Sequence, residues 1–194
     1  DEAVEGTRQR NTQPTNVATA LLQPGGLDPY MEESATWWWL HWLLTGPDCQ
    51  LPVWWMIIHE LPIVELDEDI LLQACQQIVD ASTWNTPHES SIAKDISAFV
   101  RTYGDPRVSR GKFDDQFGCP LRDLNLLTAS PTSGYRLANE RPASLPGEIV
   151  LAALLDHAAM QPDTANTIAL ARLATDPGAP GRAFRLNDTD IAEL

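Results

Sequence analysis

The residues best suited to chemistry lie in one tract, from Lys94 to Asp123, where carboxylates and strong bases follow one another closely. Its aspartates Asp95, Asp114 and Asp115 are candidate ligands for Mg²⁺, an ion that a few carboxylates and several waters hold in proteins. A bound Mg²⁺ can assist the cleavage of a phosphodiester. Neighbouring bases would then neutralise phosphate charge and position a nucleic-acid strand. The bases that could do so are Arg101, Arg107, Arg110 and Lys112.

The same residues also allow a purely structural interpretation. Asp95 can pair with Arg101 or with a neighbouring helix, and Asp114 can cap a short helix, so no spacing in the tract is diagnostic by itself. The sequence contains no GxxxxGK[ST], GxGxxG, GxSxG or HExxH motif. An ATP or dinucleotide cradle and a zinc site therefore find no support.

Charge is divided unevenly along the chain. The net charge is −14, yet no Lys or Arg lies between Asn11 and Ala93, a span that contains eleven acidic residues. Residues 94–194 hold eleven bases against thirteen acids. The negative net charge of the chain argues against a nucleic-acid partner, whereas the tract 101–112, with four bases and one acid, is locally basic. The sequence thus indicates an acidic docking half and a separate place where DNA and metal could meet.

Helices must position these charges. Asp67 is a good N-cap for a helix over Glu68–Ala81, whose apolar residues recur at helical spacing. A second amphipathic helix is predicted over Glu89–Tyr103, and it carries Asp95 and Arg101. The polar segment that follows, 104–119, is too long for a simple turn and is typical of a functional or disordered loop.

After this loop the sequence predicts a short helix over Pro120–Leu127 and a β-hairpin formed by Leu126–Ala129 and Tyr135–Ala138. Helices that run into a hairpin have the order of a winged helix-turn-helix. The predicted fold class is therefore mainly α, a helical domain with a winged-helix-like middle and short β-hairpins.

Further helices are predicted on both sides of this middle. Met31–Thr45 and Leu51–Leu61 are apolar nearly all round and should be buried. Their six tryptophans suit a hydrophobic core or a protein interface better than base stacking, because no base accompanies them. The other predicted elements are helices over 17–22, Leu145–Met160 capped by Ser144, and Thr167–Ala174, a strand over Ala183–Leu186, and a last helix capped by Asn187 or Asp188.

The predicted organisation has four parts, and the last three together, residues 17–194, are expected to form one compact unit. They are a flexible arm (1–16), an acidic Trp-rich helical part (17–66), a winged-helix-like part (67–142) and a C-terminal helical part (143–194). The three cysteines, Cys49, Cys75 and Cys119, match neither a zinc pattern nor a disulfide framework and indicate reduced thiols in a cytoplasmic protein. No apolar run approaches the ~20 residues of a membrane span, so no membrane contact is expected.

Six stretches resemble, in the same order, a bacterial family of formerly unknown function that is encoded beside DNA phosphorothioation genes. The family includes the SspB-type component of single-strand phosphorothioation. The stretches are LDPYMEESATWWWLHWLL (27–44), WWMIIHELP (54–62), SIAKDISAFVRTY (91–103), CPLRDLNLL (119–127), SLPGEIVLAALLD (144–156) and GAPGRAFRL (178–186). The resemblance covers most of residues 27–194 and implies that the family's N-terminal helical part precedes Asp1.

The resemblance implies a Mg²⁺-dependent protein that nicks double-stranded DNA, so that sulfur can replace a non-bridging phosphate oxygen in a system of anti-phage defence. The partners it implies are a cysteine desulfurase, an ATPase and a sulfur-transfer enzyme, and a homo-oligomer is also allowed. Asp95 and Asp115 lie in or beside matched stretches and are the expected catalytic residues, with Asp114 as a further metal ligand. The alternative is a non-catalytic DNA-binding or scaffold subunit, whose acidic half docks a basic partner.

Overall fold

Two helices, α4 and α5, form where their amphipathic sequences predict them. The computed structural model describes residues 13–62, 64–82, 87–104, 118–131, 134–161 and 167–194. Within it α4 spans Glu68–Ala81 and α5 spans Glu89–Tyr103, the predicted bounds. The carboxylate of Asp67 caps α4 by accepting hydrogen bonds from the backbone N–H groups of Asp69 and Ile70, at 3.0 and 3.2 Å.

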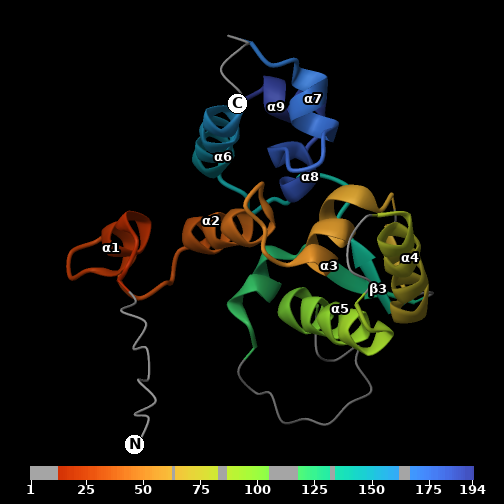
Figure 1. The fold of residues 1–194 in the computed structure, drawn as a ribbon. Coiled ribbons are helices and arrows are strands. Elements are labelled where there is room, and N and C mark those ends of the chain that lie inside the picture. The colour runs from red at the N-terminus through yellow and green to blue at the C-terminus, as the bar shows by residue number, and fades with distance from the viewer. Residues whose placement is uncertain (1–12, 63, 83–86, 105–117, 132–133, 162–166) are drawn as a thin grey trace, which may run out of the picture.

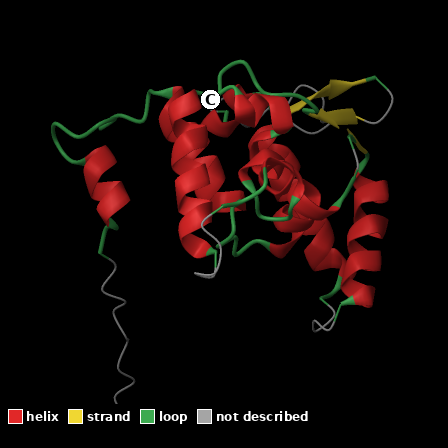
Figure 2. Ribbon diagram, turned by 90° about the horizontal axis from the view of Figure 1, so that it is seen from above, coloured by secondary structure: helices red, strands yellow, loops and turns green. Residues whose placement is uncertain are grey.

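A small antiparallel sheet lies beside these helices (Figure 2). Strands β2 (Leu127–Ser130) and β3 (Gly134–Leu137) form the predicted hairpin. Strand β1 (Glu65–Leu66) was not predicted, and it pairs with β3, so the strand order is β1-β3-β2. The chain order is β1-α4-α5-β2-β3, with a 3₁₀-helix at Pro120–Leu124 before β2, and with this pairing it resembles a winged helix-turn-helix. Its first strand lies upstream of residue 67.

The helix predicted over Leu51–Leu61 forms in two pieces of different winding. Helix α3 (Pro52–Trp55) continues directly into a π-helical turn, η1 (Met56–Glu60). Four consecutive residues of this turn, from Met56 to His59, are at most 1% exposed. A regular α-helix at a protein surface would turn part of such a run toward solvent, so this segment lies inside the core. Such π-helical turns are rare and often lie at functional sites.

Other elements differ from the prediction at their ends. Helix α1 covers Asn16–Leu22, α2 covers Ser34–Thr45, the 3₁₀-helix η2 covers Pro120–Leu124, and α6 covers Gly147–Met160. The start of α2 is later than predicted because Met31 has a positive φ of 57°. Ser144 does not cap α6, because the helix begins at Gly147 and its N-cap is Pro146, with no side-chain hydrogen bond. The hydroxyl oxygen of Ser144 instead accepts the indole N–H of Trp38 at 3.3 Å.

The C-terminal part contains helices α7 (Leu170–Thr175), α8 (Pro180–Phe184) and α9 (Asp188–Ala192). The strand predicted over Ala183–Leu186 is therefore wrong. A Cβ atom on Gly181 would lie 2.3 Å from the Cα of Ala174, so α8 packs directly on α7 through glycine. The predicted cap by Asn187 is confirmed, within a capping box that opens α9.

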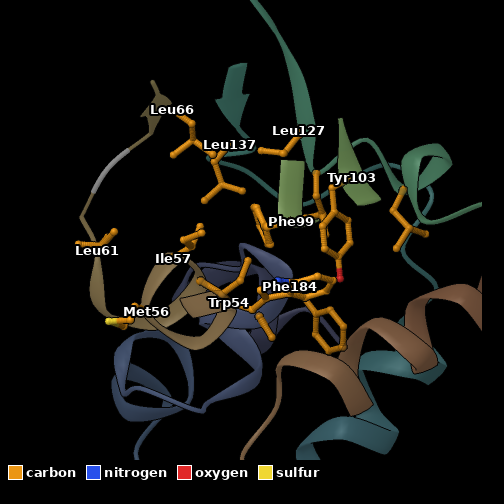
Figure 3. Close-up of a cluster of buried hydrophobic side chains, with 14 of the residues drawn as sticks. Trp54, Met56, Ile57, Leu61, Leu66, Phe99, Tyr103, Leu127, Leu137 and Phe184 are labelled. Carbon is orange, nitrogen blue, oxygen red and sulfur yellow. The ribbon is translucent and has the colours of Figure 1, made fainter. Parts of the chain in front are cut away.

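The core is aromatic and joins helices that are far apart in sequence. Trp38 and Trp42 of α2 and Trp54 of α3 are 0%, 1% and 8% exposed, which confirms that these tryptophans build a core. Trp54 packs against Phe99 of α5, and Phe184 lies near them in the same cluster (Figure 3). None of the described helices is long and apolar enough to cross a membrane.

Candidate nucleic-acid interface

Helix α5 has one covered face and one open face. Its covered face packs against α3, α4 and η2 through five buried residues: Ile92, Ile96, Phe99, Val100 and Tyr103. Its open face carries Ser91, Lys94, Asp95 and Arg101, all of which are exposed. In a helix-turn-helix the second helix of the pair enters the major groove of DNA. In chain order α5 is the second helix of the pair that it forms with α4 (Figure 1).

Helical geometry sets the relation between the charges on this face. Lys94 and Arg101 are seven residues apart, which places them on the same side of α5, roughly 10 Å apart along the axis. Asp95 lies about 100° around the helix from Lys94. Among the residues that the structure describes, the side chains of Lys94 and Asp95 form no hydrogen bond or ion pair. The alternative interpretation of Asp95, a pair with Arg101, is thus not realised.

The C-terminal end of α5 is held by Arg122 from η2. The Nε and Nη2 atoms of Arg122 donate to the backbone carbonyl oxygen of Arg101, at 3.0 and 2.8 Å. A cation at this end also suits the negative pole of the helix dipole. Arg122 therefore positions Arg101, a role that the sequence analysis missed. The only sequence signal was a base inside the short segment that begins at Pro120.

A buried polar contact holds α5 from the inside. The Nδ1 atom of His41 lies 2.8 Å from the hydroxyl oxygen of Tyr103, and its Nε2 lies 2.9 Å from the carbonyl oxygen of Ala183. Since a carbonyl only accepts, Nε2 carries the proton and Nδ1 accepts from Tyr103. Burial lowers the pKa of His41 to about 4, so the ring is neutral at pH 7.

The structure places two of the seven predicted site residues, Asp95 and Arg101, together on the open face of α5. The other five lie outside the described residues: Arg107, Arg110, Lys112, Asp114 and Asp115. In the described part of the chain no group of three metal-ligating side chains occurs. Lys94 was not among the predicted site residues, although its spacing of seven from Arg101 indicates that both lie on the same side of the helix.

Comparison with known proteins supports the resemblance found in the sequence. The chain is similar to two crystal structures of SspB, one of them bound to a magnesium ion, at 38% identity and a TM-score of 0.83. The matches cover 93% of this chain and 54% of the SspB chain, so the chain spans about half the length of these relatives. No curated protein matches the sequence. The model of a family described as "Protein of unknown function (DUF4007)" matches residues 2–194, and the chain therefore belongs to the DUF4007 family.

Proposed function

We propose that this protein binds and nicks DNA in a bacterial DNA phosphorothioation system. The observation that carries the proposal is the open face of α5, where Lys94 and Arg101 align beside the unpaired carboxylate of Asp95. The similarity to SspB at 38% identity supports the biological setting. The partners would be DNA and the enzymes of sulfur transfer that the sequence resemblance implies: a cysteine desulfurase, an ATPase and a sulfur-transfer enzyme.

In this proposal the cations of α5 hold the DNA backbone. Lys94 and Arg101 are exposed, and Lys94 has no partner among the described residues, so their charges are available to phosphates. Ser91, one turn before Lys94, lies near the helix start, where helix-turn-helix proteins contact base edges. Arg122 keeps the last turn of α5 in place while the strand is bound.

The same proposal assigns Mg²⁺ to Asp95, together with Asp114 and Asp115. The exposed carboxylate of Asp95 fits this role, because Mg²⁺ is commonly held by one or two carboxylates and keeps several waters. A bound Mg²⁺ would stabilise the charge that develops on the phosphate during cleavage. The SspB structure with a bound magnesium ion is consistent with this choice of metal.

A plasmid assay tests the proposal. Supercoiled plasmid is incubated with the purified chain, with and without Mg²⁺, and open circles are quantified on a gel. We expect nicking only with Mg²⁺, and we expect Asp95→Asn to abolish it. The matched control is Asp80→Asn, which removes an exposed carboxylate from α4 and should leave nicking unchanged. Full nicking by Asp95→Asn would remove Asp95 from the site.

A second function, a non-catalytic DNA-binding or scaffold subunit, is favoured by one feature. The acidic start of α4, at Glu68 and Asp69, is exposed and could dock a basic partner. The same plasmid assay separates the two functions, because a subunit of this kind would retard the plasmid on the gel and leave it supercoiled with or without Mg²⁺.

A further inference from the structure

A pocket unrelated to α5 lies between the end of the sheet and the C-terminal helices. Its volume is about 190 Å³, and its lining contains both apolar and polar residues. The polar residues that line it are Asn139, just after β3, with Arg182, Arg185 and Asn187 from the α8–α9 region. None of the described residues that line it is a carboxylate. The pocket is therefore rich in hydrogen-bond donors and carries two positive charges.

Arg185 occupies a backbone position that is costly for its residue type. It follows α8 with φ of 61° and ψ of 41°, in the left-handed region where glycine is the usual residue at the end of a helix. A non-glycine residue in this region stores backbone strain, and such strain concentrates at functional sites. The guanidinium group of Arg185 lies beside the π-helical turn η1.

The guanidinium of Arg185 is only partly satisfied by the protein. Its Nη2 donates to the carbonyl oxygen of Ile58 in η1 at 3.2 Å. Its Nε is buried and has no hydrogen-bond partner in the described part of the chain. No described carboxylate pairs with Arg182 or Arg185. A buried charge without a counter-ion is unfavourable, so an anion that entered the pocket would be stabilised by both.

The partial burial of Arg185 also shows in its acid–base chemistry. Burial, helped by the neighbouring charge of Arg182, lowers the pKa of Arg185 to about 10. Among the described residues no acidic group raises the pKa of Arg185 again, which agrees with a described lining that contains no carboxylate. At pH 7 both arginines remain charged.

We propose that this pocket binds a phosphate group, held by Arg182 and Arg185 with the amides of Asn139 and Asn187. Planar guanidinium groups donate pairs of hydrogen bonds to oxyanions, and a phosphate offers several acceptor oxygens and up to two charges to match two arginines. Either inorganic phosphate or the terminal phosphate of a nucleotide could supply this chemistry. In Figure 1 helices α7–α9 lie on the other side of α3 from α5, so the site is separate from the proposed DNA face.

The test measures thermal unfolding of the whole chain against ligand concentration at constant ionic strength, with chloride as the reference anion. The probes are inorganic phosphate, a 5′-phosphorylated dinucleotide and the same dinucleotide without that phosphate. We expect the melting temperature to rise with phosphate and with the phosphorylated dinucleotide, but not with the unphosphorylated one. A rise with inorganic phosphate alone would identify the free ion as the ligand, and a rise only with the phosphorylated dinucleotide would identify the nucleotide end.

Three variants connect the effect to the pocket. Arg185→Met keeps a long apolar side chain and should weaken phosphate binding roughly tenfold or more, because charge-assisted hydrogen bonds are lost. Arg182→Gln should also weaken phosphate binding, and because Arg182 is half-buried and outside the core, this variant remains informative if Arg185→Met folds poorly. Arg172→Gln is the control, since Arg172 is exposed, paired with Asp176 and outside the lining.

The proposal is overturned if neither inorganic phosphate nor the phosphorylated dinucleotide raises the melting temperature more than chloride does. It is also overturned if Arg182→Gln responds to phosphate as strongly as the unmodified chain and Arg172→Gln. Neither measurement involves duplex DNA or nicking, so the outcome is independent of the function proposed for α5.

Discussion

His41 of α2 and Tyr103 at the end of α5 share a hydrogen bond of 2.8 Å in the interior, where both side chains are 0% exposed. The other nitrogen of His41 donates to Ala183 of α8, so one imidazole ring joins three helices. The rings of His41 and Tyr103 also meet edge to face, with centroids 5.4 Å apart. The open face of α5 thus depends on a polar contact buried behind it.

Removing this contact should lower stability. Tyr103→Phe keeps the ring but leaves the buried Nδ1 of His41 without a donor, which costs about 1–3 kcal/mol. Urea denaturation followed by circular dichroism should show this loss in the free energy of unfolding. Tyr30→Phe is the control, because Tyr30 is 84% exposed and its hydroxyl is replaceable by water. Equal stability of the two variants would contradict the role assigned to Tyr103.

Acidification should destabilise the protein before most carboxylates titrate. Burial lowers the pKa of His41 and His59 from 6.5 to about 4. Below pH 6.5 both imidazoles therefore bind a proton in the unfolded chain, whereas in the folded chain they bind it only near pH 4. The stability that the two neutral histidines contribute is fully present above pH 6.5, is lost as the pH falls through this window, and is gone below about pH 4.

Each shift of this size corresponds to about 3 kcal/mol, and two such shifts approach the whole stability of an ordinary domain. We expect the free energy of unfolding, measured in urea at several pH values, to drop steeply between pH 6 and pH 4.5. The exposed His88 supplies the comparison, since His88→Gln should leave this profile unchanged. A flat profile over that range would show that the buried histidines titrate normally.

DNA affinity should depend on salt through the cations of α5. Each phosphate contact that is lost reduces the slope of log affinity against log salt by about 0.9. The double variant Lys94→Gln, Arg101→Gln should therefore lower the slope by roughly 2, as measured by fluorescence anisotropy with a duplex. Arg172→Gln, which removes an exposed base far from α5 in sequence, should keep the original slope. An unchanged slope in the double variant would place the DNA elsewhere.

The packing of α8 on α7 should depend on the absence of a side chain at Gly181. A Cβ atom there would lie 2.3 Å from the Cα of Ala174, and neither backbone can yield cheaply. Gly181→Ala should cost at least about 1–3 kcal/mol in the free energy of unfolding, the range for overpacked sites. Gly147→Ala, whose Cβ would meet only Leu194 at 3.5 Å, should be neutral or slightly stabilising.

Local sequence predicted the elements that carry their own signals. The helices α4 and α5 have clear apolar periodicity, and α4 also has its cap at Asp67, so their bounds agree with the prediction. The hairpin at 127–137 was likewise predicted from its turn residues. The strand predicted over Ala183–Leu186 is wrong because four residues are too few to distinguish the hydrophobic period of a strand from that of a helix. The segment instead belongs to the region of α8, which packs on α7 through the contact between Gly181 and Ala174.

The sequence by itself determined the helical class, the aromatic core and the division between an acidic half and a locally basic tract, because composition and periodicity act over a few neighbouring residues. Only the tertiary structure decided what depends on partners far away in the chain. Strand β1 has two residues and exists through its pairing with β3. The buried contact of His41 with Tyr103 joins positions 62 residues apart, and the pocket of Arg185 borders residues near Val64 and Asn139. No local pattern encodes such contacts, since packing of distant segments creates them.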